Sequence, residues 1–199
     1  MSQVNEKMRE RLLNLVFERA FTYNEEKPFI LSSGKTSTYY LDCRKVTLIP
    51  EGMDCIGRLI FENIQDLKVQ GIGGLTLGAD PIAYAVMSAA YQNQPNRQYI
   101  KTFIVRKEKK GHGLQREIEG DLRPGDRAVV VDDVVTTGQS TITAIERAKA
   151  FGLLVEKAIV LIDRQEENGL ARIRETGVPV EALLSREEII ARYRISLQK

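Results

Sequence analysis

The segment VVVDDVVTTGQS, residues 129–140, contains the most informative pattern in this chain of 199 residues. Its unbroken valines predict a buried parallel strand over residues 128–132, which the adjacent carboxylates Asp132 and Asp133 end. The residues that follow predict a tight turn, and the turn opens a helix expected over residues 141–151.

This turn has the chemistry of a phosphate site. N–H groups at a helix N-terminus lack partners within the helix, and the helix dipole adds partial positive charge. Gly138 allows close approach of the backbone, but no lysine follows it, which excludes the nucleoside-triphosphate loop GxxxxGK[ST]. Asp132 and Asp133 suit the vicinal hydroxyls of a sugar or a hydrated metal ion. A strand–turn–helix can serve packing alone, but two unpartnered buried acids would be costly. The segment therefore predicts a site for a phosphorylated ribose.

Strands and helices alternate around this segment. Pro81 opens a helix expected over residues 80–91, and Ser185 with Glu188 forms a capping box for a C-terminal helix. Apolar runs predict four further strands, over residues 68–73, 98–106, 156–163 and 180–184. The alternation predicts an α/β fold in which a mostly parallel five-stranded sheet is flanked by helices.

Two parts of the chain do not follow this alternation. Residues 1–48 predict an amphipathic helix over residues 5–21 and a hairpin that pairs residues 29–31 with residues 38–41. We call residues 1–48 the N-terminal hood. Residues 107–121, KEKKGHGLQREIEGD, are polar and without periodicity, which predicts a flexible lid loop beside the ligand site.

Length and composition narrow the class of protein. The length favours a single domain over residues 1–199. Lys and Arg number 29 and Asp and Glu number 27, so the net charge is 29 − 27 = +2, which argues against a dedicated nucleic-acid-binding protein. No apolar run approaches the ~20 residues that span a bilayer, and the N-terminus is too polar for a signal peptide. Cys43 and Cys55 are expected to be unpaired thiols in a reducing compartment. We therefore expect a soluble, cytoplasmic protein with no membrane or nucleic-acid partner.

Four motifs resemble those of the type I phosphoribosyltransferases, and in particular of the orotate phosphoribosyltransferase family. Residues 129–140 resemble the signature that binds phosphoribosyl pyrophosphate (PRPP). RKEKKGHG (residues 106–113) resembles the family's catalytic loop, FILSSGKTSTYYLD (residues 29–42) its substrate strand, and DRQE (residues 163–166) its orotate-binding motif. The resemblance implies a type I phosphoribosyltransferase fold with a hood and a flexible catalytic loop. It also implies transfer of the 5-phosphoribosyl group from PRPP to orotate, giving orotidine 5-phosphate and pyrophosphate in pyrimidine (UMP) biosynthesis.

The resemblance further implies roles for particular residues. Asp132 and Asp133 would hold the ribose hydroxyls and stabilise positive charge that develops on the sugar, and Lys110 and His112 would also take part in catalysis. Arg164 would bind the orotate carboxylate through its two parallel donors, together with Thr136 and Ser33. PRPP binding is implied for Arg106, Lys107, Lys110, His112, Asp132, Asp133, Val134, Val135, Thr136, Thr137, Gly138, Gln139 and Ser140.

A metal and a partner subunit are implied as well. Mg²⁺ would bind mainly through the hydroxyls and pyrophosphate of the substrate, with Asp132 and Asp133 contributing indirectly. The family's catalytic loop reaches the neighbouring subunit's site, which implies a homodimer. Ser32 and Gly78 depart from the pattern, because some members carry lysine there, while Asp80 could help to position the metal.

The residues leave other interpretations open. A phosphoribosyltransferase acting on a purine or on uracil would share the PRPP signature, although the KKGHG loop and the DRQE motif disfavour it. A catalytically silent nucleotide sensor that controls transcription would share the whole fold. His112 could be simply exposed, the basic loop could be an ordinary solvated face, and Arg164 could form a surface salt bridge. Tyr39 and Tyr40 are plausible core aromatics.

Overall fold

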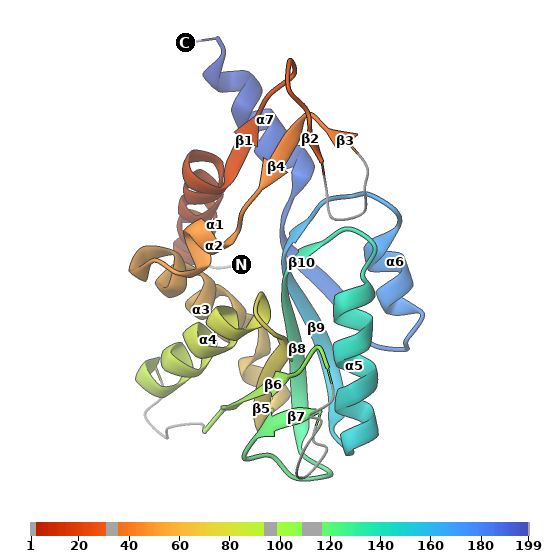
Figure 1. Cartoon of the computed structure of the whole chain (residues 1–199). Coiled ribbons are helices and arrows are strands. Elements are labelled where there is room, and N and C mark those ends of the chain that lie inside the picture. Colours follow the sequence, from red (N-terminus) through yellow and green to blue (C-terminus); the bar gives the residue numbers. More distant parts are fainter. Residues whose placement is uncertain (1–2, 31–35, 94–98, 109–116, 199) are drawn as a thin grey trace.

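The computed structural model describes residues 3–30, 36–93, 99–108 and 117–198. Its main sheet has six strands in the order β10-β9-β8-β5-β6-β7 (Figure 1). Pairing is parallel throughout, except that β7 runs antiparallel to β6. The strands are β5 (Gly71–Leu75), β6 (Lys101–Val105), β7 (Ile118–Gly120), β8 (Arg127–Val135), β9 (Leu154–Asp163) and β10 (Val180–Ser185). The predicted sheet of five parallel strands is confirmed, and β7 adds a short antiparallel edge.

β7 lies within the segment predicted as a loop, residues 107–121, so that prediction is wrong for the last residues of the segment. Ile118 pairs with Val105 and is only 5% exposed, because it packs in the core on one face of the sheet. Three residues are too few to show the alternation of apolar and polar side chains that predicts a strand. β7 forms because its backbone pairs with the edge of β6.

Helices cover both faces of the sheet (Figure 1). α1 (Gln3–Leu15), α3 (Pro50–Ile64) and α4 (Ala79–Asn93) contribute to one buried cluster, and α5 (Gln139–Phe151) and α6 (Gly169–Arg174) to the other. Alternate residues of a strand point to opposite faces, and β8 follows this rule. Val129 and Val131 pack into the first cluster and Val130 into the second, as the unbroken valine run predicts.

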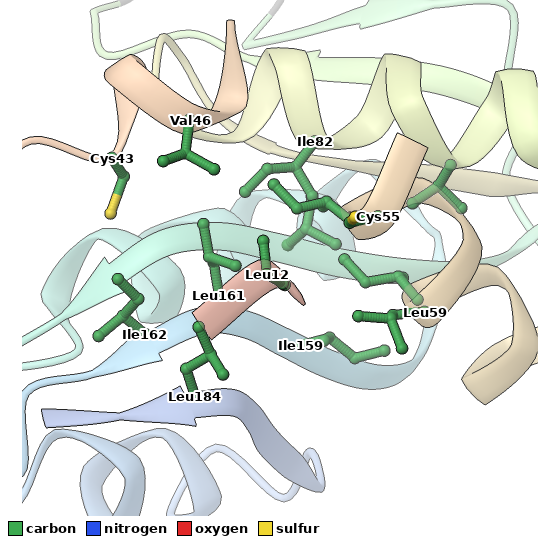
Figure 2. Packing of buried hydrophobic residues seen from close by; sticks show 14 of the residues in the cluster. Leu12, Cys43, Val46, Cys55, Leu59, Ile82, Ile159, Leu161, Ile162 and Leu184 are labelled. Atoms are coloured by element: carbon green, nitrogen blue, oxygen red, sulfur yellow. The ribbon is translucent and has the colours of Figure 1, made fainter. Parts of the chain in front are cut away.

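Figure 2 shows the larger cluster, in which the helices lie against β9. Leu12 of α1 and Leu59 of α3 belong to the same buried group as Ile159 of β9. Cys43 and Cys55 are buried, free thiols in this cluster, so the prediction that they form no disulfide is confirmed.

The hood contains two small ladders that differ from the prediction. β1 (Phe21–Tyr23) pairs antiparallel with β4 (Tyr39–Leu41), and β2 (Phe29–Ile30) pairs with β3 (Thr36–Ser37). The predicted pairing of residues 29–31 with residues 38–41 is therefore wrong. Tyr39 and Leu41 are buried while Tyr40 between them is exposed, and only pairing with β1 places these two side chains on the core.

Three short helical elements accompany the helices α1 and α3. The predicted N-terminal helix is present, but its last turn, η1 (Val16–Ala20), is π-helical. α2 (Arg44–Thr47) precedes α3, and a 3₁₀ turn, η2 (Gln65–Leu67), follows it.

Within the described residues, every helix is too short or too polar to cross a membrane.

The C-terminal helix α7 (Arg186–Ser196) packs beside β1 of the hood (Figure 1). The predicted capping box is confirmed, since the side chain of Ser185 accepts from the amide of Glu188 and the side chain of Glu188 accepts from the amide of Ser185. The ring of Tyr193 lies 5.6 Å from that of Phe21 and 4.8 Å from that of Tyr23. The hood is thereby held by the end of the chain.

Candidate active site

The strand order creates a topological switch point between β5 and β8. From β5 the chain moves outward to β6 and β7, then returns to β8 and moves outward the other way to β9 and β10. Ligands of open α/β sheets bind at such a point, outside the carboxyl ends of the strands. Pairing between β5 and β8 stops at Gly73 and Val130, whereas β8 stays paired with β9 as far as Val135. The last residues of β8 therefore continue past the β5 ladder.

Asp132 and Asp133 lie within this last part of β8. The prediction that the strand ends at Asp132 is wrong, because β9 continues beside it and pairs Asp132 with Val160 and Val134 with Ile162. The two acids consequently belong to a strand supported on one edge, which fixes their backbone before the turn begins.

Asp132 is a buried acid, only 5% exposed. Its Oδ2 accepts a hydrogen bond from the Thr141 hydroxyl at 2.8 Å, and its Oδ1 accepts from the amide of Asp133 at 3.0 Å. Burial, helped by the neighbouring charge of Asp133, raises the pKa of Asp132 to about 7. Burial also raises the pKa of Asp133, although the Val134 amide donates to its Oδ1 at 2.9 Å. Two acids held in this way favour a cation or a hydroxyl donor beside them.

The turn after β8 presents a helix N-terminus to the same place. Gly138 has φ +77°, in the left-handed region that favours glycine, and α5 begins at the next residue. Glycine has no side chain to cap the helix, and the Thr137 hydroxyl accepts from the Gln139 amide at 3.3 Å. The amides of Ser140 and Thr141 occupy positions without intrahelical acceptors. The turn can therefore bind an anion such as a phosphate.

α6 packs against this turn, and the sequence pattern had not indicated this helix. Arg172 of α6 donates to the carbonyl oxygen of Thr137 at 2.7 Å and to the side chain of Gln139 at 3.3 Å. A Cβ on Gly138 would lie 2.7 Å from the carbonyl oxygen of Gly169, and one on Gly169 would lie 2.4 Å from that of Thr136. Both glycines are thus required by close backbone contact. The signal for α6 was Leu170 and Ile173, spaced as on one helix face.

A cavity of about 540 Å³ joins these features to the hood. Hood residues Ile30, Tyr40 and Leu41 line one side of it. The other side contains most of the predicted site residues: Asp132, Val134, Thr136, Thr137, Gly138, Gln139, Ser140 and Arg164, with Thr141. The side chain of Val135 is instead buried in the core, beside Gly169 of α6.

Arg164 lies in the wall of this cavity and is 7% exposed. Its amide donates to the carbonyl oxygen of Val135 at 3.0 Å, which places the DRQE motif beside the end of β8. Tyr39 and Glu166 contact its guanidinium. The sequence pattern predicts Tyr39 as a core aromatic, which its burial confirms, and it indicates no role for Glu166.

Two other predicted residues line a second cavity, of about 400 Å³, at the end of β6. Arg106 pairs with Glu119 of β7 at 2.7 Å, and Lys107 lies beside it. Arg147 of α5 donates to the carbonyl oxygens of both Arg106 and Lys107. Lys110, His112 and Ser33, like Ser32, lie outside the described residues.

The loop after β5 lies beside both the second cavity and the carboxylate of Asp133. Thr76 lines the second cavity and donates to Asp80 at 2.6 Å. A Cβ on Gly78 would lie 2.6 Å from Oδ1 of Asp133. A lysine at this position, as some phosphoribosyltransferases carry, would therefore displace the carboxylate of Asp133.

The carboxylates of Asp132 and Asp133 are the candidate metal-binding groups of the site. In the described parts of the chain, His, Cys, Asp and Glu form no group of three or more that could hold a metal ion. Mg²⁺ keeps several waters and is usually bound by one or two carboxylates together with substrate phosphates. Asp132 and Asp133 supply such a pair, and Oδ1 of Asp80 is a further buried oxygen that has no hydrogen-bond partner among the described residues.

Comparison with known proteins assigns the family. The phosphoribosyl transferase domain family matches residues 46–182. Orotate phosphoribosyltransferase of Aquifex aeolicus is 43% identical over 182 residues, which cover 92% of this chain and 97% of that protein. The chain belongs to the orotate phosphoribosyltransferase family. Members of this family transfer the phosphoribosyl group of PRPP to orotate in pyrimidine biosynthesis, so they are pentosyltransferases. Phosphoribosyltransferases generally use Mg²⁺ with PRPP.

Solved structures of orotate phosphoribosyltransferases share the fold. The Mycobacterium tuberculosis enzyme in complex with Fe(III) dicitrate is 35% identical, with a TM-score of 0.77, over 92% of this chain and 98% of that one. The same enzyme in complex with PRPP is 30% identical, with a TM-score of 0.71, over 92% of each chain. The type I phosphoribosyltransferase fold is therefore confirmed.

Proposed function

We propose that this chain forms orotidine 5-phosphate from PRPP and orotate in the cavity between the hood and the turn after β8. The observation that carries this assignment is the pair Asp132 and Asp133, which leads directly into the uncapped N-terminus of α5. The acids for a ribose and the amides for its phosphate all lie within residues 132–141, and β9 and Arg172 of α6 hold this segment in place.

PRPP binds along this segment. The 5-phosphate accepts hydrogen bonds from the turn at residues 136–140, where the helix dipole and the hydroxyls add to the backbone donors. Asp132 and Asp133 bind the ribose hydroxyls, and their negative charge stabilises the positive charge that develops on the sugar as pyrophosphate leaves. Val135 contributes only its backbone, since its side chain is buried, whereas Val134 lines the cavity.

Orotate binds on the hood side of the cavity. The guanidinium of Arg164 binds the carboxylate that distinguishes orotate from uracil, with Thr136 and Ser33 completing the base site. Arg106, Lys107, Lys110 and His112 neutralise the pyrophosphate, and the loop that carries them excludes water, which would otherwise capture the reactive sugar.

Mg²⁺ is the metal that this site would take. Asp132 and Asp133 would hold it through water and through the ribose hydroxyls, because Mg²⁺ keeps several waters and is usually bound by one or two carboxylates with substrate phosphates. When bound, it neutralises charge on the pyrophosphate. The free thiols Cys43 and Cys55 suit a reducing compartment, and we place the reaction in the cytoplasm.

The active form is a homodimer in which each lid loop serves the partner's site. Tyr84, Met87 and Tyr91 lie on one face of α4 and are 40%, 38% and 51% exposed, and Tyr99 beside Tyr91 is 73% exposed. Large exposed apolar side chains grouped in this way mark contact surfaces. Arg106 and Lys107 line a different cavity from Asp132, which suits a loop that acts across a subunit boundary.

The reaction is tested by following orotate absorbance with PRPP and Mg²⁺. Wild-type protein should consume orotate, and Lys110→Ala should lose most of this activity, because it removes a charge from the pyrophosphate site. Lys149→Ala is the matched control, since Lys149 is exposed in the last turn of α5 and its ammonium donates to the carbonyl oxygen of Thr176. If wild-type protein consumes uracil, adenine or hypoxanthine instead, the base assignment is wrong. Binding of PRPP without any turnover would indicate a silent sensor.

The shared site is tested by mixing two inactive variants. Lys107→Ala lacks a loop contact and Asp133→Asn lacks a ribose contact, so a mixed dimer should contain one intact site and recover part of the activity. Absence of recovery after demonstrated subunit exchange would contradict the shared site.

A further inference from the structure

Arg164 belongs to a cluster of four side chains, whose other three members come from separate parts of the chain. Tyr39 comes from β4 of the hood, Glu166 follows β9, and Arg186 is the first residue of α7 (Figure 1). Arg164 and Tyr39 are each at least nine-tenths buried, with exposures of 7% and 7%. A buried guanidinium requires partners, and those partners determine its orientation.

The contacts hold one edge of Arg164 and leave another for the cavity. Its Nε donates to the hydroxyl oxygen of Tyr39 at 3.3 Å, and its Nη2 donates to Oε1 of Glu166 at 3.4 Å. Its Cζ lies 4.9 Å from the centre of the Tyr39 ring, within reach of a cation–π contact. Among the described residues, Nη1 makes no hydrogen bond. These contacts therefore fix the orientation of the guanidinium plane before a ligand binds.

Glu166 does not neutralise this cluster. Its Oε1 also accepts from the hydroxyl of Tyr39 and, at 3.4 Å, from Nη1 of Arg186. Two guanidinium groups thus share one carboxylate, which leaves one positive charge beside the cavity. Burial and the bond to Glu166 raise the pKa of Tyr39, so its hydroxyl remains a donor to Glu166 at neutral pH. A second carboxylate, brought by the ligand, would complete the cluster.

From these contacts we infer that Tyr39 and Glu166 are positioning residues that hold the guanidinium of Arg164 in one orientation. They thereby set the preference for a base bearing a carboxylate. The inference rests on the proposed function and extends it to two residues that touch Arg164 rather than the substrate. The physical basis is pre-organisation, because a guanidinium that is already held in place loses less conformational freedom when the carboxylate of the base binds.

The test compares Tyr39→Phe, Glu166→Gln and the double variant by steady-state kinetics. Each single variant should raise the KM for orotate about ten-fold, the effect of losing one hydrogen bond to a charged group. The KM for PRPP should change less than about two-fold, because the phosphate turn is not touched. The ratio of kcat/KM for orotate to kcat/KM for uracil should fall by the same factor as orotate affinity, since uracil lacks the carboxylate.

The double variant distinguishes a shared task from two separate ones. If Tyr39 and Glu166 act together on Arg164, the KM of the double variant for orotate should rise about ten-fold, as in the single variants. Two independent effects would instead raise this KM about a hundred-fold. Tyr23→Phe is the matched control, because Tyr23 lies directly opposite Tyr39 in the β1–β4 ladder and packs on Tyr193 instead. It should leave both KM values unchanged. Thermal melting of each variant verifies folding.

Three results would overturn the inference. An unchanged KM for orotate in Tyr39→Phe and Glu166→Gln would exclude positioning. An equal rise in the KM values for orotate and PRPP would indicate a general structural role, and a multiplicative effect in the double variant would exclude a joint task. Arg164→Ala separates this inference from the proposed function: if it loses orotate affinity while Tyr39→Phe does not, only the positioning role fails. If wild-type protein does not consume orotate, the proposed function fails and the inference with it.

Discussion

At the scale of single residues, Asp132 combines a destabilising environment with a central place in the site. It is 5% exposed, beside a second acid, and its hydrogen bonds to Thr141 and to the Asp133 amide offset only part of the desolvation. Its pKa is raised to about 7 from an ordinary value of 3.8. Such residues often mark sites where stability has been given up for function.

Replacing Asp132 with asparagine should stabilise the protein in a pH-dependent way. The folded state holds the proton more tightly than the unfolded chain, so ionisation of Asp132 destabilises the fold increasingly from about pH 4 to about pH 7, and constantly above. Asp132→Asn removes this penalty. Its melting temperature should exceed that of wild type at pH 8, and the difference should shrink as the pH falls towards 4.

Thermal melts across this pH range measure the effect, and activity should be lost in the same variant because the ribose contact is charged. Thr141→Val is a useful control, since it removes a hydrogen bond that favours the charged form and should therefore lower stability above pH 7. A pH-independent change in melting temperature for Asp132→Asn would show that the carboxyl does not titrate in this range.

At the scale of elements, the turn between β8 and α5 depends on α6. The carbonyl oxygen of Thr137 accepts from Arg172, and Gly138 and Gly169 are in close backbone contact. A phosphate site built from backbone amides works only if the backbone is held in place, because the ligand must otherwise supply the energy to order it.

Arg172→Ala should therefore weaken PRPP binding specifically. We expect the KM for PRPP to rise about five- to ten-fold, corresponding to loss of about one charge-assisted hydrogen bond, with little change in the KM for orotate. Arg174→Ala on the same helix serves as control, because Arg174 donates to the carbonyl oxygen of Val180 and not to the turn. Equal effects of the two substitutions on PRPP binding would contradict a local role for Arg172.

At the scale of the whole molecule, contacts between the N-terminal hood and the C-terminal helix α7 hold the hood beside the site. Arg9 of α1 pairs with Glu188 of α7 at 2.6 Å and donates to the carbonyl oxygen of Leu183 at 2.9 Å. Tyr193 of α7 packs on Phe21 and Tyr23 of β1, whose partner β4 carries Tyr39 and Tyr40. The hood is thus anchored by residues far from it in the sequence.

Removing the ring of Tyr193 should loosen this anchor. Tyr193→Ala is expected to lower the free energy of unfolding by about 1–3 kcal/mol, from two lost aromatic contacts and reduced burial. It should also raise the KM for orotate more than that for PRPP, because the hood lies beside the proposed orotate site and does not contribute to the phosphate turn at residues 136–140. Leu197→Ala, at a position 69% exposed just after α7, should change stability by less than about 0.5 kcal/mol. Urea unfolding and steady-state kinetics measure both effects, and equal stabilities for Tyr193→Ala and wild type would contradict the anchor.

The sequence by itself determined the features that depend on neighbouring residues. The valine run of β8, the glycine turn, the alternation of strands with helices and the capping box at Ser185 all follow from local backbone preference and periodicity. Only the tertiary structure decided where β8 ends, because β9 extends its pairing to Val135, and which strands of the hood pair. It also brought Tyr39 to Glu166 across 127 positions. Such contacts arise from packing between elements, and no local pattern of side chains encodes them.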